Sequence, residues 1–239
     1  MKTIAFVDVE TGGLNPAVDP LLEVGLVIWS VPHRSIIRCE STLLHAEKND
    51  AFSSNGIPVG LVRERGESRR SADVLLAEAI TDYDVDAIVA HNAEFDRPWF
   101  APCVRAPWLC SMDDFDYPRT SSGKSLTAIA LAHGVGVVHA HRAMADCLTL
   151  AALFGRVAEI LDAKPLHEPG HVPAFEHWLA RAARPRATYQ ALVSFDDKDK
   201  AKQLGFRWNA EAKTWTKRLA REDVGALPFR VQIESKKGD

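Results

Sequence analysis

Apolar residues along the first 160 positions predict three strands, followed by helices and strands in alternation. β-Branched and aromatic runs predict strands over 3–9, 22–29 and 35–44. Residues 46–70 are polar and are expected to be irregular. Further along, helices are expected over 71–83, from 94 onward, 124–133 and 143–161, with strands over 86–90 and 108–112. This order predicts an α/β fold, in which helices flank a mixed sheet.

The last third of the chain predicts a separate small unit. Three prolines and a glycine interrupt the stretch 164–173, and Arg184-Pro185-Arg186 makes a second break after a short helix expected over 174–183. Strands over 189–194, 214–218 and 229–233, with a helix over 198–204, then predict a small α+β domain. We therefore expect domains over 1–163 and 188–239, joined by a linker over 164–187 that contains the short helix.

Composition bounds the class of protein. The chain has 239 residues, of which 46% are hydrophobic and 26% charged, as is typical of a globular protein in water. No apolar run approaches the roughly 20 residues that span a bilayer, and the first residues are too short for a secretory signal, so we expect a cytoplasmic location and no membrane partner. Four cysteines without a C-x-x-C pair are expected to be reduced thiols: Cys39, Cys103, Cys110 and Cys147.

The net charge of −3 is divided unevenly along the chain. Residues 1–185 hold 17 Lys and Arg against 24 Asp and Glu, a net charge of −7, and residues 186–239 hold 12 against 8, a net charge of +4. An acidic body suits a site that uses metal ions, and a basic end suits a module that contacts polyanions. Chance variation between two domains explains the division nearly as well.

Two carboxylates stand together at the end of the first predicted strand, in Asp8-Val9-Glu10. Because side chains alternate across a strand, Asp8 and Glu10 point to one side while Val9 points to the other. Paired carboxylate oxygens suit hard cations such as Mg²⁺ or Mn²⁺. A D-x-E pattern alone is more often a solvated strand end, so the interpretation depends on acids elsewhere in the chain.

Two later motifs each combine a histidine with an aspartate near the start of a helix. H-N-A-E-F-D covers 91–96 and H-R-A-M-A-D covers 141–146. The helix dipole favours the negative charge of Asp96 at such a position. If His141 precedes its helix and Asp146 begins it, the imidazole can lie over Asp146 and accept a proton from water near neutral pH. His139 is the rival candidate for this base.

Taken in order, the three motifs resemble those of the DnaQ-like 3′–5′ exonucleases of the DEDDh group. The resemblance covers residues 3–155, and 108–112 and 143–153 are most similar to the exonuclease X branch. It implies a ribonuclease H-like fold with a mixed five-stranded sheet flanked by helices. The implied cofactors are two Mg²⁺ or Mn²⁺ ions, with His141 as general base. The ions would be held by Asp8, Glu10, Asp96 and Asp146, with Asp8 bridging both.

The resemblance also implies a substrate and a set of substrate-binding residues. The substrate would be the 3′ end of DNA, preferably single-stranded, and the products would be nucleoside 5′-monophosphates, in DNA repair or replication. Asn55-Gly56-Ile57 lies where the family often has H-G-I, so Asn55 stands in for a histidine. Leu14 and Phe95 are candidates for stacking on bases, although core packing explains Phe95 equally well. The implied set is Thr11, Gly12, Gly13, Leu14, Asn55, Ile57, Asn92 and Phe95.

Three rival interpretations remain open. An exoribonuclease that trims RNA 3′ ends would carry the same acids. A proofreading subunit would need a polymerase, or another replication or repair protein, as its partner. A binding protein with an inactive nuclease fold is the third, and the five filled catalytic positions argue against it.

The stretch 191–218 resembles a small module of unassigned function in phage and plasmid DNA-processing proteins. Its aromatic and basic residues, among them Trp208, Lys213 and Trp215, suit contact with nucleic acid. Packing of the tryptophans between the predicted helix and a small sheet is the simpler explanation.

Overall fold

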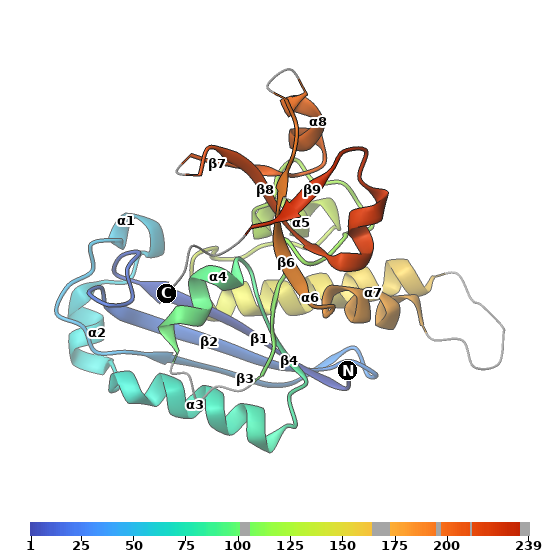
Figure 1. Ribbon diagram of the computed structural model, residues 1–239. Helices are drawn as coiled ribbons and strands as arrows, with labels where there is room; N and C mark the ends of the chain where they lie inside the picture. Colours follow the sequence, from blue (N-terminus) through green and yellow to red (C-terminus); the bar gives the residue numbers. More distant parts are fainter. Residues whose placement is uncertain (101–105, 164–172, 195–196, 211, 235–239) are drawn as a thin grey trace. The chain divides into compact units, whose positions relative to one another are not determined.

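The computed structural model describes residues 1–100, 106–163, 173–194, 197–210 and 212–234. The chain forms two compact units, Met1–Ala182 and Ala183–Asp239, each with its own sheet (Figure 1). Helix α7 (Ala174–Ala182), which was expected inside the linker, belongs to the first unit because Phe175 and Leu179 are buried in its core. Residues 164–172 of the expected linker lie outside the described residues.

The first unit contains a mixed sheet with the strand order β3-β2-β1-β4-β5. The first three strands pair antiparallel, and β1, β4 and β5 pair parallel. This arrangement confirms the predicted five-stranded mixed sheet. The strands are β1 (Thr3–Thr11), β2 (Leu21–Ser30), β3 (Ser35–Leu43), β4 (Ala87–Ala90) and β5 (Trp108–Cys110).

Helix α3 (Arg69–Asp82) covers one face of this sheet, and α6 (Ala143–Asp162) covers the other (Figure 1). Alternate residues of β1 pack into the two cores. Ala5, Val7 and Val9 are buried with residues of α3, whereas Ile4 and Phe6 are buried with residues of α6. Because side chains alternate along a strand, Asp8 and Glu10 continue the row of Ile4 and Phe6 and face the side of α6.

Aromatic side chains fix α6 on the sheet. Phe6 of β1 contacts Phe154 of α6 edge to face, with 4.9 Å between ring centroids, and Trp29 of β2 contacts Phe175 of α7 at 5.9 Å. Edge-to-face pairs of this kind add about 0.5–1.5 kcal/mol each to the burial of the rings. These contacts pack α6, which carries Asp146, against β1, and α7 against β2.

The remaining helices are short, and some differ from the prediction. The stretch 46–70 contains two helices where none was expected, because four and seven residues show too little of the apolar repeat to be recognised. The helix expected from 94 onward is a single turn that continues as a 3₁₀ turn. These elements are α1 (Phe52–Asn55), α2 (Val59–Arg65), α4 (Ala93–Asp96), η1 (Arg97–Trp99) and α5 (Leu126–Ala132).

The second unit is a small antiparallel sheet with the order β7-β8-β6-β9 and one short helix, which confirms the expected α+β character. Tyr189, Ala201, Phe206 and Leu219 form its buried core. The short strand β7 was not expected. Its elements are β6 (Arg186–Ala191), α8 (Lys198–Gln203), β7 (Arg207–Asn209), β8 (Thr214–Ala220), η2 (Arg221–Ala226) and β9 (Val231–Ile233).

Among the described residues, no helix combines the length and the apolar character that crossing a bilayer requires. Cys39, Cys110 and Cys147 are free thiols. Cys103 lies outside the described residues.

Candidate active site

Five acidic side chains line one pocket of about 380 Å³ in the first unit: Asp50, and the four acids of the motifs, Asp8, Glu10, Asp96 and Asp146. Asp8 and Glu10 come from the end of β1, Asp96 ends the turn of α4 that follows β4, and Asp146 lies in the first turn of α6. Because β1 and β4 are parallel, their carboxyl ends meet at one edge of the sheet. Ligand oxygens of Asp8, Glu10 and Asp146 lie within 4.8 Å of one another. The four acids therefore converge, as the motifs predicted.

Burial and mutual repulsion raise the pKa values of these carboxyl groups. Burial is the main cause for Asp8 and Asp96, whose pKa values lie well above the usual range, and neighbouring carboxylates raise them further. Burial, then Asp146 and Glu23, raise the pKa of Glu10 to about 7, while burial also raises that of Asp146. Carboxylates in this arrangement are destabilised when ionised unless positive charge is added.

The donor set fits divalent cations. All four side chains offer oxygen, which Mg²⁺ and Mn²⁺ prefer. Asp96 is 2% exposed, and its Oδ2 atom is buried with no hydrogen-bond partner among the described residues. A buried, unpaired carboxylate oxygen beside three other acids is the environment that a bound cation would satisfy.

His141 lines this pocket, two residues before the start of α6. Its backbone N–H donates to Oδ2 of Asp146 at 3.1 Å, which ties the histidine to one of the four acids. His141 has a φ of 67° and His139 a φ of 53°. A left-handed conformation costs a residue with a side chain roughly 1–2 kcal/mol, and such strain concentrates at functional sites. His141 lines the pocket, and His139 is not among the described residues that line it.

An ion pair that the sequence analysis missed holds the start of α6 against β2. The Arg142 guanidinium donates from Nε and Nη2 to the two carboxylate oxygens of Glu23, at 2.9 and 2.8 Å, and the Ala143 N–H donates to the same carboxylate at 3.1 Å. Glu23 is 3% exposed and stands opposite Glu10 in the β1–β2 register. This contact fixes the turn that contains Asp146.

Gly25 allows that close approach. A Cβ atom at this position would lie 2.4 Å from the carbonyl carbon of Ala143, which is closer than real Cβ contacts. Glu23 itself could have indicated this ion pair from the sequence, because it is the only charged residue in the apolar strand Leu21–Ser30. A lone acid in a buried strand indicates a specific partner.

The loop after β1 forms another side of the pocket. Thr11 donates from Oγ1 to the carbonyl oxygen of Gly13 at 2.6 Å, and the Gly12 N–H donates to the carbonyl oxygen of Pro20 at 2.8 Å. Leu14 is 83% exposed and lines the pocket, so it does not serve the core. Phe95 also lines the pocket, but it packs partly into the core beside Trp99.

Asn55 forms a hydrogen bond with the backbone of this loop. It is buried, its Nδ2 donates to the Thr11 carbonyl oxygen at 3.0 Å, and its Oδ1 accepts from the Ile57 N–H at 3.0 Å. Asn55 therefore acts on the loop, and direct contact with a base stays a prediction. Ile57 and Asn92 do not line the pocket: Ile57 is buried beside Leu22, and Asn92 directly precedes α4 with a φ of 74°.

His91 lines the pocket although the sequence analysis gave it no separate role. Its Nδ1 lies 2.8 Å from Ser111 Oγ and its Nε2 lies 2.9 Å from the Lys124 carbonyl oxygen. Burial lowers the pKa of the imidazole. A neutral ring that donates to the carbonyl and accepts from the hydroxyl satisfies both contacts, and it joins the ends of β4 and β5 to the segment before α5. In the sequence, the position of His91 as the first residue of the motif H-N-A-E-F-D could have indicated this role.

Different known proteins are similar to different parts of the chain. The chain is 30% identical over 167 residues to the DNA polymerase III PolC-type of Thermotoga maritima, which covers 66% of this chain and 12% of the polymerase. It is 27% identical over 143 residues to ribonuclease T of Shewanella baltica, covering 54% of this chain and 64% of that protein. Residues 187–233 match the family described as a domain of unknown function (DUF8626).

Solved structures agree with the first of these relationships. A structure of exonuclease X in complex with 5′ overhanging duplex DNA superposes with a TM-score of 0.51 at 21% identity, and the match covers 75% of this chain and 99% of that chain. By its strand order, its flanking helices and its ordered acidic motifs, the chain has the fold of the DnaQ-like 3′–5′ exonucleases.

Proposed function

We propose that this protein is a metal-dependent exonuclease that removes nucleoside 5′-monophosphates from the 3′ ends of DNA, with single-stranded DNA preferred. The observation that carries the proposal is the convergence of Asp8, Glu10, Asp96 and Asp146 on one pocket with His141 in its lining. Relatives and structural neighbours named as exonucleases, a DNA polymerase and a ribonuclease support nuclease chemistry. Bound cations would neutralise charge on the phosphate during phosphodiester cleavage, and the four carboxylates offer the oxygen ligands to hold them.

The four carboxylates of Asp8, Glu10, Asp96 and Asp146 would hold two Mg²⁺ or Mn²⁺ ions. When bound, such ions would supply an activated water and would stabilise charge on the leaving 3′ oxygen. His141 would accept a proton from the attacking water, which an imidazole does efficiently near neutral pH. Its place in the pocket lining and the hydrogen bond from its backbone N–H to Asp146 support this role.

The loop Thr11–Leu14 and Phe95 would hold the terminal nucleotide. Leu14 offers an exposed apolar surface on which a base of any kind can pack, and Phe95 offers part of a ring. Asn55 would contribute by fixing the backbone of this loop. Ile57 and Asn92 would contribute through the fold around the pocket, since neither lines it.

Labelled oligonucleotides test the proposal directly. Single-stranded DNA, duplex DNA and RNA of the same sequence, each labelled at the 5′ end, are incubated with the full chain in Mg²⁺, in Mn²⁺ and in EDTA. We expect a ladder that shortens from the 3′ end of DNA with either ion, faster on the single strand, and no ladder in EDTA. DNA that stays intact with both ions, or a ladder that persists in EDTA, would contradict the proposal.

RNA trimming is the second candidate, and the relationship to ribonuclease T is the observation that favours it. Faster shortening of the RNA than of the matched DNA would replace DNA by RNA as the substrate. The relationship to a PolC-type polymerase supports a replication or repair protein as a partner, which capture of a replicative polymerase on the immobilised protein would test. The free thiols Cys39, Cys110 and Cys147 support action in the reducing cytoplasm.

A further inference from the structure

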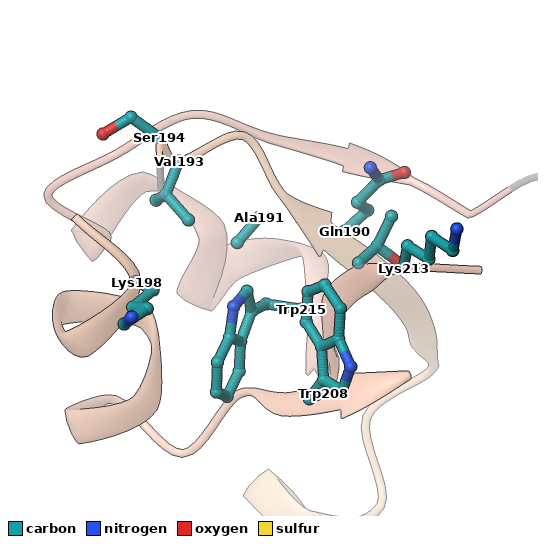
Figure 2. Close-up of a pocket in the computed structure, with 9 residues that line it drawn as sticks. Gln190, Ala191, Val193, Ser194, Lys198, Trp208, Lys213 and Trp215 are labelled. Atoms are coloured by element: carbon teal, nitrogen blue, oxygen red, sulfur yellow. The ribbon is translucent and has the colours of Figure 1, made fainter. Parts of the chain in front are cut away.

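The second unit contains a pocket of about 390 Å³ that differs in kind from the acidic one. Trp208 and Trp215 form its aromatic wall, Ala191 and Val193 add apolar surface, and Lys198 contributes a positive charge (Figure 2). A volume of this size is within the range of small-ligand sites. The pocket lies within the segment 187–233, which matches a domain of unknown function.

The two tryptophans are positioned by the hairpin of β7 and β8. They stand directly opposite each other in the register, and their ring centroids are 5.6 Å apart. Trp215 packs partly against the core of the unit, whereas Trp208 is 52% exposed and is not part of that core. The expected packing of both rings between helix and sheet is therefore wrong for Trp208. An exposed indole on a pocket wall is a surface for a ligand.

Positive charge accompanies the aromatic wall. Figure 2 shows the two indoles side by side, with Lys198 and Lys213 on opposite sides of the pair. The unit as a whole, residues 183–239, holds 13 Lys and Arg against 8 Asp and Glu, a net charge of +5. Flat rings for stacking beside lysines for phosphates are the pair of features with which proteins bind single-stranded nucleic acid.

We propose that the Trp208–Trp215 pocket binds an unpaired base of single-stranded DNA, while Lys198 and Lys213 contact the neighbouring phosphates. The choice of DNA as the polymer rests on the proposed function. A stacked base is accepted whatever its identity, because every base has an aromatic face. The pocket would thus bind the DNA strand independently of its sequence, through residues other than those that line the acidic pocket.

Binding is measured in EDTA with the full chain and a fluorescein-labelled single strand of 20 thymidines, by fluorescence anisotropy. We expect Trp208→Ala to weaken binding roughly 5- to 100-fold, and Trp208→Phe to retain most of the affinity because a ring remains. Ile233→Ala is the control, since Ile233 is exposed on the same sheet but does not line the pocket. An unchanged Kd for Trp208→Ala, with a wild-type melting curve, would overturn the proposal.

The lysines are tested by the salt dependence of the same binding. Lys198→Gln and Lys213→Gln are each expected to reduce the slope of log K against log salt by about 1. Lys202→Gln, on the same helix as Lys198 but outside the pocket lining, is expected to change it less. Equal slopes for all three variants would overturn the contact with phosphates.

Two further arms separate this proposal from others. If only the matched RNA strand loses affinity in Trp208→Ala, the pocket binds RNA and the proposal for DNA fails. If DNA is not cleaved but binding depends on Trp208, the proposed nuclease function fails and the pocket stands. If DNA is cleaved but binding is independent of Trp208, the pocket fails and the nuclease function stands.

Discussion

The two units carry pockets of nearly equal volume, about 380 and 390 Å³, that are built in opposite ways. The pocket of the first unit collects carboxylates, and residues 1–182 hold 16 Lys and Arg against 24 Asp and Glu, a net charge of −8. The pocket of the second unit joins indoles with lysines in a segment of net charge +5. An acidic surface repels a nucleic acid unless cations are bound, whereas a basic one attracts it at any time.

The construction of the pockets differs as well. Asp8 and Asp146 are 138 positions apart in the chain and meet only through the sheet and α6. The second pocket draws its lining from Gln190 to Trp215, a span of 26 residues. Under the two proposals, the comparison teaches that catalysis uses groups held on elements far apart in the sequence, whereas attraction of a DNA strand needs only a local hairpin and a helix.

Asp8→Asn should give the largest effect and break the comparison on one side only. It removes one of the four carboxylates that would hold the ions, so we expect hydrolysis to fall to the background rate. Binding of single-stranded DNA in EDTA should stay the same or tighten because an acidic group is lost. The labelled-DNA assay and fluorescence anisotropy measure the two quantities. A rate of hydrolysis within tenfold of wild type would contradict the proposed role of Asp8 as a metal ligand.

His141→Ala should reduce the rate constant of cleavage roughly 10²- to 10⁴-fold, the usual loss when a general base is removed. The matched control is His139→Ala, two positions away and also in the left-handed region, but outside the pocket lining. Single-turnover cleavage of labelled DNA measures both. Equal losses in the two variants would show that the loop, and not the imidazole of His141, matters.

Removal of metal should make stability depend on pH in the first unit. The pKa of Glu10 rises from 4.5 to about 7 on folding, so in EDTA the folded chain binds this proton more tightly than the unfolded chain. The resulting stability is present below pH 4.5 and is lost as the pH rises to 7, by about 3 kcal/mol. Mg²⁺ should restore it above pH 7.

Thermal melting at pH 5 and pH 8, with and without Mg²⁺, measures this effect. Glu10→Gln is the comparison, because it removes one titrating group and should make the dependence on pH in EDTA shallower, while the raised pKa values of Asp8, Asp96 and Asp146 leave part of it. The same dependence in Glu10→Gln and wild type would rule out Glu10 as its source.

Glu23→Gln should give the smallest effect, a loss of cleavage of about 10- to 100-fold, the usual consequence of weakening the support of a metal site. The variant removes the negative charge of Glu23 that pairs with Arg142, and this should loosen the turn that contains Asp146. Glu159→Gln is the control, since it breaks an exposed pair with Arg156 on the same helix. Similar activities of the two variants would contradict a positioning role for Glu23.

Much of this protein could be predicted from the sequence because the signals are local. The alternation of Ile4, Phe6, Asp8 and Glu10 against Ala5, Val7 and Val9 is a property of any strand, and it placed both acids on one face before the sheet was known. Long strands and helices repeat their pattern often enough to be recognised. The order of the acidic motifs indicated the family resemblance and, through it, the fold.

Only the tertiary structure decided what those faces meet. The β1–β2 register sets Glu23 opposite Glu10, the gap at Gly25 admits α6, and Arg142 then reaches Glu23 from a position 119 residues away. Likewise, the hairpin register pairs Trp208 with Trp215 and leaves one indole exposed. The physical reason is that periodicity determines which way a side chain points, whereas burial and ion pairing depend on the element that packs against it.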